Sequence, residues 1–545
     1  MGWRGPVLAA FVALLAALPS LMLLPPLDRD EARFAQATAQ MLEGGDYVDI
    51  RFQDDPRWKK PIGIYWLQAA SVSLTSAVED RDIQAYRLPS ALGAMLAAWA
   101  VAWAGAAFMG HRAGFLAGAM MGATFLLSTE AGIAKTDAVL CGLVTLSMAA
   151  LGRIYLSCLA GERPRREHKL LFWLGLGLSI LIKGPIGLMV VALSIIALSL
   201  WDKNFKWVGK LGWGWGLPLT ALILGPWAIA ITIITDGGFW REAIGGDLAP
   251  KLVGAHESHS GFFGMYATLS PLLVFPLTLI LPAALSTGWH RRAEPVVRFA
   301  LCWLIPAWLV FEIAPTKLWH YTLPTFGALA LLMAAALTQP IGKVSRITGA
   351  LLSLFAGVII CLITVYGLTE YGRSTAQTWA TLTIVFTVLA AAVSAFLLVN
   401  RAAITGVLVG ICCGIIAHGA LAGTIRQLRP LSIAPRLVKT LESAELNPAQ
   451  GRYPGPIAIT RFHEPSFVFL TSRDTQLTDA AGAAKALSEG RPAIVEAGDE
   501  QSFREALSEH RASGRAVGVV SGHNYSSGDH VRLTVYAPVT PREAR

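Results

Sequence analysis

About thirteen long apolar segments between the N-terminus and residue 424 constrain this chain more than any other feature. A helix needs roughly 20 apolar residues to cross a bilayer. Only 15% of the residues are charged, whereas soluble domains carry about 25%, so lipid must solvate much of the surface. The pattern predicts a mainly α-helical, polytopic membrane protein. The expected spans are residues 6–26, 87–109, 114–130, 137–157, 170–182, 184–200, 211–234, 265–287, 298–314, 321–338, 348–370, 377–399 and 403–424.

The basic residues of the loops predict the orientation. Cytoplasmic loops are enriched in Lys and Arg, and every second loop of this chain is basic if the N-terminus lies inside. An odd number of spans then places the C-terminal tail outside. The net charge of +9 is therefore assigned to loops, and no nucleic-acid binding is expected. The inner loops hold Arg112; Arg163, Arg165, Arg166 and Lys169; Lys203, Lys206 and Lys210; Arg291, Arg292 and Arg298; Lys343 and Arg346; and Arg401.

Three of the expected spans allow a second interpretation. Residues 1–26 fit a secretory signal peptide, but no convincing small-residue cleavage site follows, so we expect an uncleaved first span. The short spans on either side of Lys183 share a Lys-Gly-Pro joint and could form one long helix. Merging them would invert every later loop, and the basic-loop pattern therefore favours a break at Lys183.

Two hydrophilic regions lie outside the membrane in this topology. The first loop, residues 27–86, contains amphipathic stretches at 30–43 and 61–77, which are expected to lie as helices along the membrane surface. The tail, residues 425–545, alternates helix-like segments with short apolar strands and predicts a small α/β domain beside a membrane module of residues 1–424. The six cysteines all lie in or beside apolar runs, so neither a disulfide framework nor a CxxC metal site is expected. The predicted strands are Ile457–Thr460, Ala493–Val495, Ala516–Val520 and Val531–Tyr536.

Unusual charges gather on the outer face of the predicted bundle. A single charge at the end of a span is often a solvated anchor, and a loop histidine pair is more often solvated than metal-bound. Acids and bases that recur on one face, in loops far apart in sequence, instead predict a site between helices. These residues are Asp28-Arg29-Asp30-Glu31, Lys59-Lys60, Lys135-Thr136-Asp137, Lys183, Arg241, Lys251, His256, Glu257, His259, Glu312, Lys317, His320 and Tyr321.

The residue types in this set suit glycosyl transfer from a lipid phosphate. Four cations, Lys60, Lys183, Lys251 and Lys317, are candidates for neutralising a phosphate leaving group, whose charge grows in the transition state. Asp30 or Asp137 is the candidate base for the proton of an attacking hydroxyl. A site at the interface would leave the lipid tail of the donor in the membrane while its head group meets an acceptor in water.

Several motifs follow one another in a specific order and spacing over about residues 25–340. They are Asp30-Glu31-Ala-Arg33-Phe34-Ala-Gln with Gln40 to Tyr47, Lys60-Pro61-Ile62 with Tyr65-Trp66, Asp137, Lys183-Gly184, Phe239-Trp240-Arg241 with Lys251 and His259, and Lys317 to Pro324. Together these motifs resemble those of a known family, the polyprenyl-phosphate-dependent GT-C glycosyltransferases of the protein mannosyltransferase and lipid A aminoarabinose transferase group. The order and spacing of the motifs support the resemblance more than any single motif does.

The resemblance implies a helical GT-C fold and an inverting transfer from an undecaprenyl monophosphate sugar. The acceptor would be lipid A, another glycolipid, a polysaccharide or a protein, at the periplasmic face of a bacterial inner membrane. Asp30, with Glu31 beside it, takes the place of the catalytic first-loop acid. Lys60, Lys183 and Lys251 take the places of donor-phosphate contacts. The positions expected to line the site are Arg33, Tyr65, Asp137, Arg241, His259 and Tyr321.

Two positions depart from the family pattern, and two other functions remain open. Lys59 replaces the Glu that precedes Lys-Pro in the lipid A transferases, so a divalent metal is possible but not predicted. Lys251 stands where Arg is common. A transporter or flippase would place its charges near the midplane, often in paired broken helices, and no matching halves are visible. A polysaccharide polymerase or ligase would use a lipid diphosphate donor, and the Asp30-Glu31 motif argues against it by family likeness alone.

Overall fold

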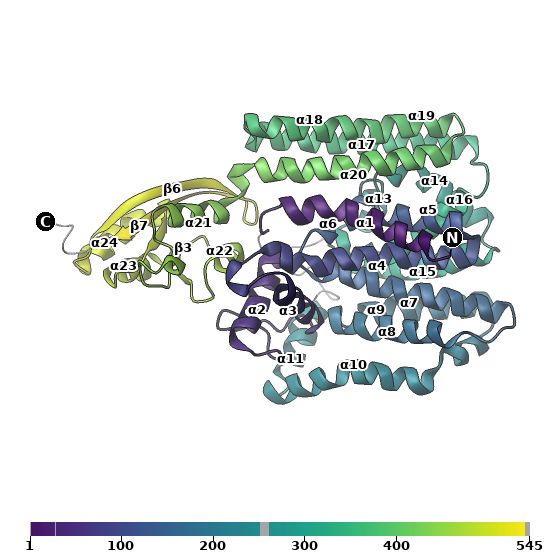
Figure 1. The fold of residues 1–545 in the computed structure, drawn as a ribbon, viewed down its shortest axis with the longest axis horizontal. Helices are drawn as coiled ribbons and strands as arrows, with labels where there is room; N and C mark the ends of the chain where they lie inside the picture. The colour runs from purple at the N-terminus through teal and green to yellow at the C-terminus, as the bar shows by residue number, and fades with distance from the viewer. Residues whose placement is uncertain (1, 28, 251–260, 540–545) are drawn as a thin grey trace.

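The computed structural model describes residues 2–27, 29–250 and 261–539, and it shows a helical bundle with a small domain at one end (Figure 1). Within these residues, eight helices are long and apolar enough to span a membrane. The chain is thus a mainly α-helical, multi-pass membrane protein, as predicted. The eight are α1 (Arg4–Leu23), α4 (Ile83–Met109), α7 (Thr136–Leu159), α10 (Trp213–Ile234), α15 (Pro295–Ile313), α17 (Lys343–Tyr371), α18–α19 (Ser374–Val399) and α20 (Ala403–Gln427).

The other expected spans are also helical, but they are short, broken or charged, so the count of thirteen is not confirmed. The pair α13 (Met265–Leu273) and η4–α14 (Leu277–His290) bends by 119°, and counting it as one span gives nine among the described residues. The break at Lys183 is confirmed, because Gly184 takes a φ of 63° that ends α8 before α9 begins. The remaining segments are α5 (His111–Gly122) with α6 (Phe125–Ala131), α8 (Arg166–Lys183), α9 (Ile186–Trp201) and α16 (Phe326–Ala336).

The first loop folds into the two helices expected from its amphipathic stretches. Helix α2 (Asp30–Gly44) begins with two acids, which favour a helix N-terminus, and it ends where Gly45 takes a φ of 69°. A two-stranded hairpin, β1 (Arg51–Phe52) and β2 (Asp55–Pro56), leads to α3 (Gly63–Thr75). Both helices lie at the end of the bundle that carries the C-terminal domain, opposite the N-terminus (Figure 1).

The C-terminal domain is built on a five-stranded sheet of order β4-β3-β5-β7-β6. The first three strands of this order are parallel, while β7 pairs antiparallel with β5 and β6. The four predicted strands are confirmed, and β4 was missed because it is only three residues long and polar. The elements are α21 (Ile433–Ser443), β3 (Ala458–Thr460), α22 (Pro465–Leu470), β4 (Gln476–Thr478), α23 (Ala480–Ser488), β5 (Ala493–Glu496), α24 (Glu500–Glu509), β6 (Gly514–Asn524) and β7 (Asp529–Pro538).

The C-terminal domain packs directly on the first loop. The Gln53 amide donates hydrogen bonds to the carbonyl oxygens of Arg473 and Thr475, at 2.9 and 2.7 Å. The buried ring of Phe469 meets the ring of Tyr86 edge-on, with 5.2 Å between centroids. Two segments that are about 400 residues apart in sequence therefore meet at this end of the bundle.

Candidate active site

A cavity of about 700 Å³ opens at this end of the bundle, between the first loop and the ends of several long helices. One part of its wall is charged, and the rest is apolar. Of the residues predicted from sequence, six line it: Asp30, Arg33, Lys60, Asp137, Lys183 and Tyr321. Charged or titratable residues that were not assigned a role also line it: Arg57, Lys59, Lys135, Asp247 and His320. The apolar lining includes Leu140, Leu188, Met189, Trp227, Phe239 and Trp240.

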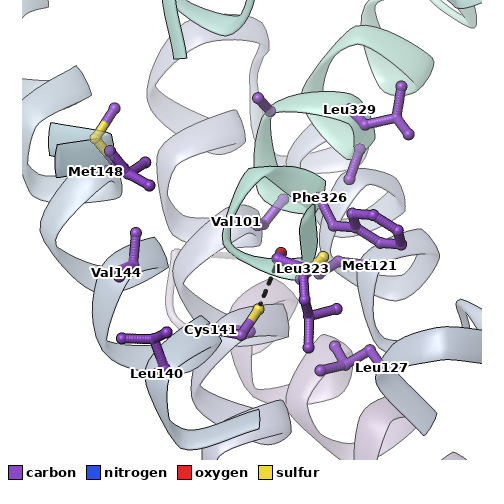
Figure 2. Packing of buried hydrophobic residues seen from close by; sticks show 14 of the residues in the cluster. Val101, Met121, Leu127, Leu140, Cys141, Val144, Met148, Leu323, Phe326 and Leu329 are labelled. Atoms are coloured by element: carbon purple, nitrogen blue, oxygen red, sulfur yellow. Dashed lines mark hydrogen bonds between the residues drawn. The ribbon is translucent and has the colours of Figure 1, made fainter. Parts of the chain in front are cut away.

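The packing of α7 fixes one wall of the cavity. Leu140, Val144 and Met148 on this helix face an apolar cluster that includes Leu323 and Phe326 (Figure 2). The Cys141 thiol donates to the Leu323 carbonyl oxygen at 3.5 Å. This contact joins α7 to η5 (Trp319–Thr325), a 3₁₀ helix that leads into α16. Because these elements are locked together, the side chains at the start of each are held at a fixed separation.

Asp137, in the first turn of α7, pairs with Lys183 at the end of α8. The Lys183 ammonium lies 2.5 Å from Asp137 Oδ1. It also lies 5.5 Å from the centre of the Tyr321 ring, at a distance typical of a cation–π contact. The sharp turn at Gly184 ends α8 at Lys183. The Lys183 ammonium therefore lies at the end of the helix, where it lines the cavity.

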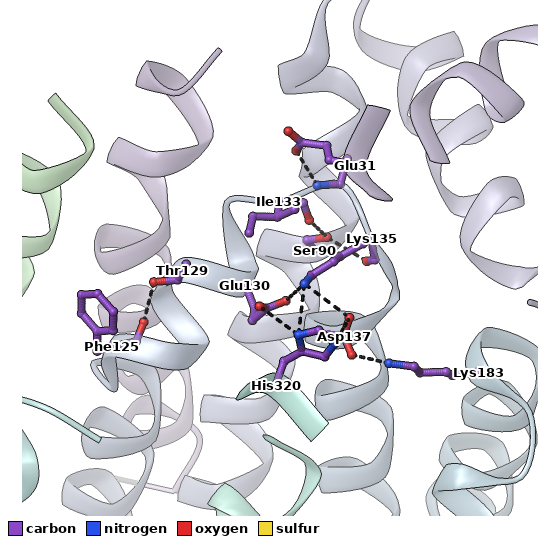
Figure 3. A network of polar contacts seen from close by, with 11 residues as sticks. Glu31, Ser90, Phe125, Thr129, Glu130, Ile133, Lys135, Asp137, Lys183 and His320 are labelled. Atoms are coloured by element: carbon purple, nitrogen blue, oxygen red, sulfur yellow. Dashed lines mark hydrogen bonds and ion pairs between the residues drawn. The ribbon is translucent and has the colours of Figure 1, made fainter. Parts of the chain in front are cut away.

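A buried polar network extends from Asp137 (Figure 3). The Lys135 ammonium lies 2.9 Å from Glu130 Oε2 and 3.8 Å from Asp137 Oδ2. His320 Nδ1 lies 3.3 Å from the same ammonium. Glu130 belongs to α6, while Lys135 precedes α7 and His320 lies in η5. Ligand atoms of Glu130, Asp137 and His320 all lie within 4.8 Å of one another, which makes this group a possible metal-ligand set among the described residues.

Asp30 faces the cavity from the first residue of α2. Its side chain is open to the cavity, although protein atoms surround it on most sides. Burial favours the neutral acid, but the positive charges of Arg57 and Lys135 and their basic neighbours outweigh it and lower the pKa of Asp30 from its ordinary value. The carboxylate is therefore ionised at neutral pH, as a proton acceptor must be.

Lys60 and Tyr65, which belong to one sequence motif, have different surroundings. The Lys60 ammonium lies 2.6 Å from Asp247 Oδ2 in η3 (Arg241–Leu248), a π-helix. Both residues line the cavity. Tyr65 is fully buried and does not line it. Its ring packs against Phe34 with 5.4 Å between centroids, and burial raises the pKa of its hydroxyl.

Three other predicted residues do not meet in the cavity. Glu31 is buried and paired with Arg87 at 2.7 Å. The Lys317 ammonium is buried and donates to the carbonyl oxygens of Glu312 and Ala314, at 2.5 and 2.9 Å, so it closes the end of α15. Arg241 is exposed and donates to the carbonyl oxygen of Asp236. Lys251 and His259 lie outside the described residues.

The sequence interpretation missed Glu130, Arg57 and Asp247 as site residues. Glu130 had a usable signal, because it is an acid at the end of an expected span and charges within such segments are usually functional. Arg57 and Asp247 lie in polar loops, where charge is ordinary. Lys135 and His320 belong to runs that were recognised as unusual, but no role was assigned to them.

Comparison with known proteins places this chain beside lipid-linked glycosyltransferases. Residues 7–237 match the family model described as dolichyl-phosphate-mannose-protein mannosyltransferase. An undecaprenyl phosphate-alpha-4-amino-4-deoxy-L-arabinose arabinosyl transferase of Pseudomonas paraeruginosa is 31% identical over 316 residues, covering 57% of this chain and 55% of that protein. The Aeromonas salmonicida protein of the same name is 30% identical over 369 residues, covering 65% and 66%. The matches thus span only about half to two thirds of these relatives' length.

Solved structures share the fold over the whole chain. ArnT from Cupriavidus metallidurans bound to undecaprenyl phosphate has a TM-score of 0.78 and covers 98% of each chain at 20% identity. Its apo state has a TM-score of 0.75 and covers 97% of each chain. At this identity the likeness establishes a common fold, which includes the C-terminal domain.

Proposed function

Because the chain belongs to the GT-C glycosyltransferases of the protein mannosyltransferase and lipid A aminoarabinose transferase group, we propose that it transfers a sugar from an undecaprenyl monophosphate carrier to an acceptor hydroxyl. The acceptor is lipid A, another glycolipid, a polysaccharide or a protein. The reaction takes place at the periplasmic face of a bacterial inner membrane, where membrane lipids surround the carrier's polyprenyl chain.

The charge of the cavity is the observation that carries this proposal. Six basic side chains line it against three carboxylates, so an anion is favoured there. The apolar lining continues from the same space and suits the first isoprene units of a carrier. A phosphate head with a hydrocarbon tail matches both parts of the wall. The basic side chains are Arg33, Arg57, Lys59, Lys60, Lys135 and Lys183, and the carboxylates are Asp30, Asp137 and Asp247.

The proposed step is an inverting displacement. The acceptor oxygen forms a bond to the anomeric carbon, the bond from that carbon to the phosphate oxygen breaks, and undecaprenyl phosphate leaves with the electron pair. Asp30 accepts the proton of the acceptor hydroxyl. Lys60 and Lys183 stabilise the charge that grows on the phosphate. Each of these ammonium groups contacts a carboxylate in the structure, so the donor phosphate competes with Asp247 and Asp137 for them.

A donor comparison tests the proposal directly. Purified protein in detergent should transfer sugar from an undecaprenyl monophosphate donor and should leave the matching diphosphate donor unused. Use of the diphosphate donor alone would instead indicate a polymerase or ligase. Transport without donor-dependent transfer would indicate a transporter or flippase. Mass spectrometry of lipids and surface glycans from a strain that lacks the protein would identify the sugar and the acceptor.

The Lys60→Ala variant is expected to weaken donor use more than acceptor use. A hydrogen bond to a charged group contributes roughly 1.5–3 kcal/mol, so we expect the donor KM to rise by about 10- to 150-fold while the acceptor KM changes little. Initial rates over a matrix of both concentrations measure this. Asp247→Asn is the matched control, since it removes the carboxylate that competes for Lys60 and should not raise the donor KM. If Lys60→Ala raised the donor KM and the acceptor KM equally, Lys60 would not be a contact of the donor phosphate.

The proposed orientation predicts which surfaces an impermeant thiol reagent reaches. Ser527→Cys, exposed in the C-terminal domain, should be labelled in intact spheroplasts. Arg163→Cys, exposed in a predicted inner loop, should be labelled only after the membrane is opened. The native Cys412, which is exposed within a span, provides the background measured in the parent chain. The reverse labelling order would contradict a periplasmic site.

A further inference from the structure

We propose that the Lys135 ammonium is a built-in cation that takes the position of a divalent metal ion among Glu130, Asp137 and His320. It acts as a positioning residue, because it holds these side chains at the cavity wall and leaves Asp137 a second cation when a phosphate competes for Lys183. The catalytic part of this inference rests on the proposed transferase function, whereas the presence of a cation site among these side chains is independent of that function.

The ammonium lies among the three potential ligand groups (Figure 3). Its distances are 2.9 Å to Glu130 Oε2, 3.8 Å to Asp137 Oδ2 and 3.3 Å to His320 Nδ1. An ammonium only donates hydrogen bonds, so Nδ1 of His320 must accept one, and the ring proton lies on Nε2. That nitrogen faces Asp137 Oδ2 at 3.6 Å. One cation thus fixes two carboxylates and the tautomer of the imidazole.

Burial makes a cation at this position necessary. Glu130 and Asp137 are each 5% exposed, and buried carboxylates require positive partners. Lys183 contacts Oδ1 of Asp137, while Lys135 lies on the side of Oδ2 and Glu130. The two negative charges of Glu130 and Asp137 equal the two positive charges of the lysine ammonium groups when the imidazole is neutral. Without Lys135, one ammonium would face two acids, and Glu130 would compete for Lys183.

A metal ion and this ammonium exclude each other. Zinc binds carboxylate oxygens and imidazole nitrogens at about 2.0–2.2 Å, and the candidate ligand atoms already lie within 4.8 Å of one another. A metal held by these atoms would occupy the space that the ammonium fills. Removing the lysine side chain should therefore turn a lysine-centred cluster into a three-ligand metal site.

Metal binding by Lys135→Ala tests the inference. With added Zn²⁺ or Co²⁺, we expect the wild-type protein to bind no ion at this cluster and the variant to bind about one equivalent, because two carboxylates and one imidazole suffice for a site with an open position. Elemental analysis after gel filtration gives the stoichiometry, and the visible absorption of bound Co²⁺ reports the ligand geometry. The double variant Lys135→Ala/His320→Ala should lose the ion. Stoichiometric binding by the wild-type protein that His320→Ala abolishes, or no binding by Lys135→Ala, would overturn the proposal.

A second measurement covers the case in which Lys135→Ala is unstable without metal. Purified in Zn²⁺, the variant should show a thermal midpoint that falls when a chelator is added, while the wild-type midpoint stays unchanged. Equal responses of the two proteins would contradict a built-in cation. Neither measurement involves sugar transfer, so a wild-type protein that fails to use an undecaprenyl donor leaves the result interpretable.

The positioning role has its own kinetic signature. Lys135→Ala should lower kcat on the order of 100-fold, as expected for a site whose groups are displaced by about 1 Å, and should change the donor KM less than Lys60→Ala does. Lys135→Arg keeps the charge and should restore part of kcat without binding metal. A donor KM that rises as much as kcat falls would indicate a direct phosphate contact instead.

Discussion

The Asp30→Asn variant is expected to fold and insert normally but to lose sugar transfer by about a hundred- to ten-thousand-fold, the usual contribution of a general base. Asparagine has nearly the same size as aspartate but accepts no proton. Asp30 begins α2 and lines the cavity, so its neutral replacement changes the chemistry without removing a buried packing group. Single-turnover rates with a saturating donor would isolate the chemical step from binding.

A carboxylate of the same loop supplies the control. Asp55 is exposed on the β-hairpin and does not line the cavity, so Asp55→Asn should keep full activity. Correct folding of both variants is checked by gel filtration and by the thermal midpoint. Full turnover in Asp30→Asn would remove Asp30 from the mechanism and transfer the base role to another carboxylate of the cavity.

The lowered pKa of Asp30 sets the sign of its pH dependence. A carboxylate with a pKa below its ordinary value of about 3.9 stays ionised as the medium becomes acidic. We therefore expect no loss of transfer from protonation of Asp30 until the pH falls below about 4. If a pH–rate profile shows an acid limb near neutrality whose midpoint shifts in Asp30→Glu, the pKa of Asp30 would be raised and not lowered, which would contradict the electrostatic effect of Arg57 and Lys135.

The Arg87→Met variant is expected to lose about 3–5 kcal/mol of stability, the cost of leaving a buried charge without its partner. Arg87 and Glu31 are 0% and 1% exposed. The guanidinium donates to both Glu31 carboxylate oxygens at 2.7 Å, and it also donates to the carbonyl oxygens of Leu24 and Pro25, at 2.7 and 2.8 Å. One side chain of α4 thereby holds the end of the first span and the start of α2.

A double-mutant cycle separates the pair from the volume change. Glu31→Gln alone should also destabilise, and the combination with Arg87→Met should cost less than the sum of the two. Arg51→Ala is the exposed comparison, because its pair with Asp49 leaves the Arg51 side chain 53% exposed and should contribute less than about 1 kcal/mol. Thermal unfolding in one detergent compares all variants. Additive costs for Arg87→Met and Glu31→Gln would contradict a coupled ion pair.

The sequence alone determined the secondary-structure elements whose pattern of apolar and polar residues reflects burial or contact with lipid. Apolar runs must meet lipid or core, so the helical segments, the break at Lys183 and the two first-loop helices could be read from it, as could four of the five C-terminal strands. Charges on one predicted face indicated a shared site, and six of the assigned residues do line one cavity. The number of spans could not be read, because hydropathy does not reveal where a helix bends or stops short.

Only the tertiary structure decided which charged neighbours face the cavity. Successive residues of a helix point about 100° apart, so Asp30 faces the cavity while Glu31 turns to Arg87 and also accepts a hydrogen bond from the Ala134 amide. Lys317, in the segment that follows α15, is directed to the carbonyl oxygens of Glu312 and Ala314. Glu130 joins the site through its contact with Lys135. Asp247 joins it through Lys60, which is 187 residues away in sequence. The pairs Lys60–Asp247 and Arg87–Glu31 depend on distances across the fold, which no local pattern of residues encodes.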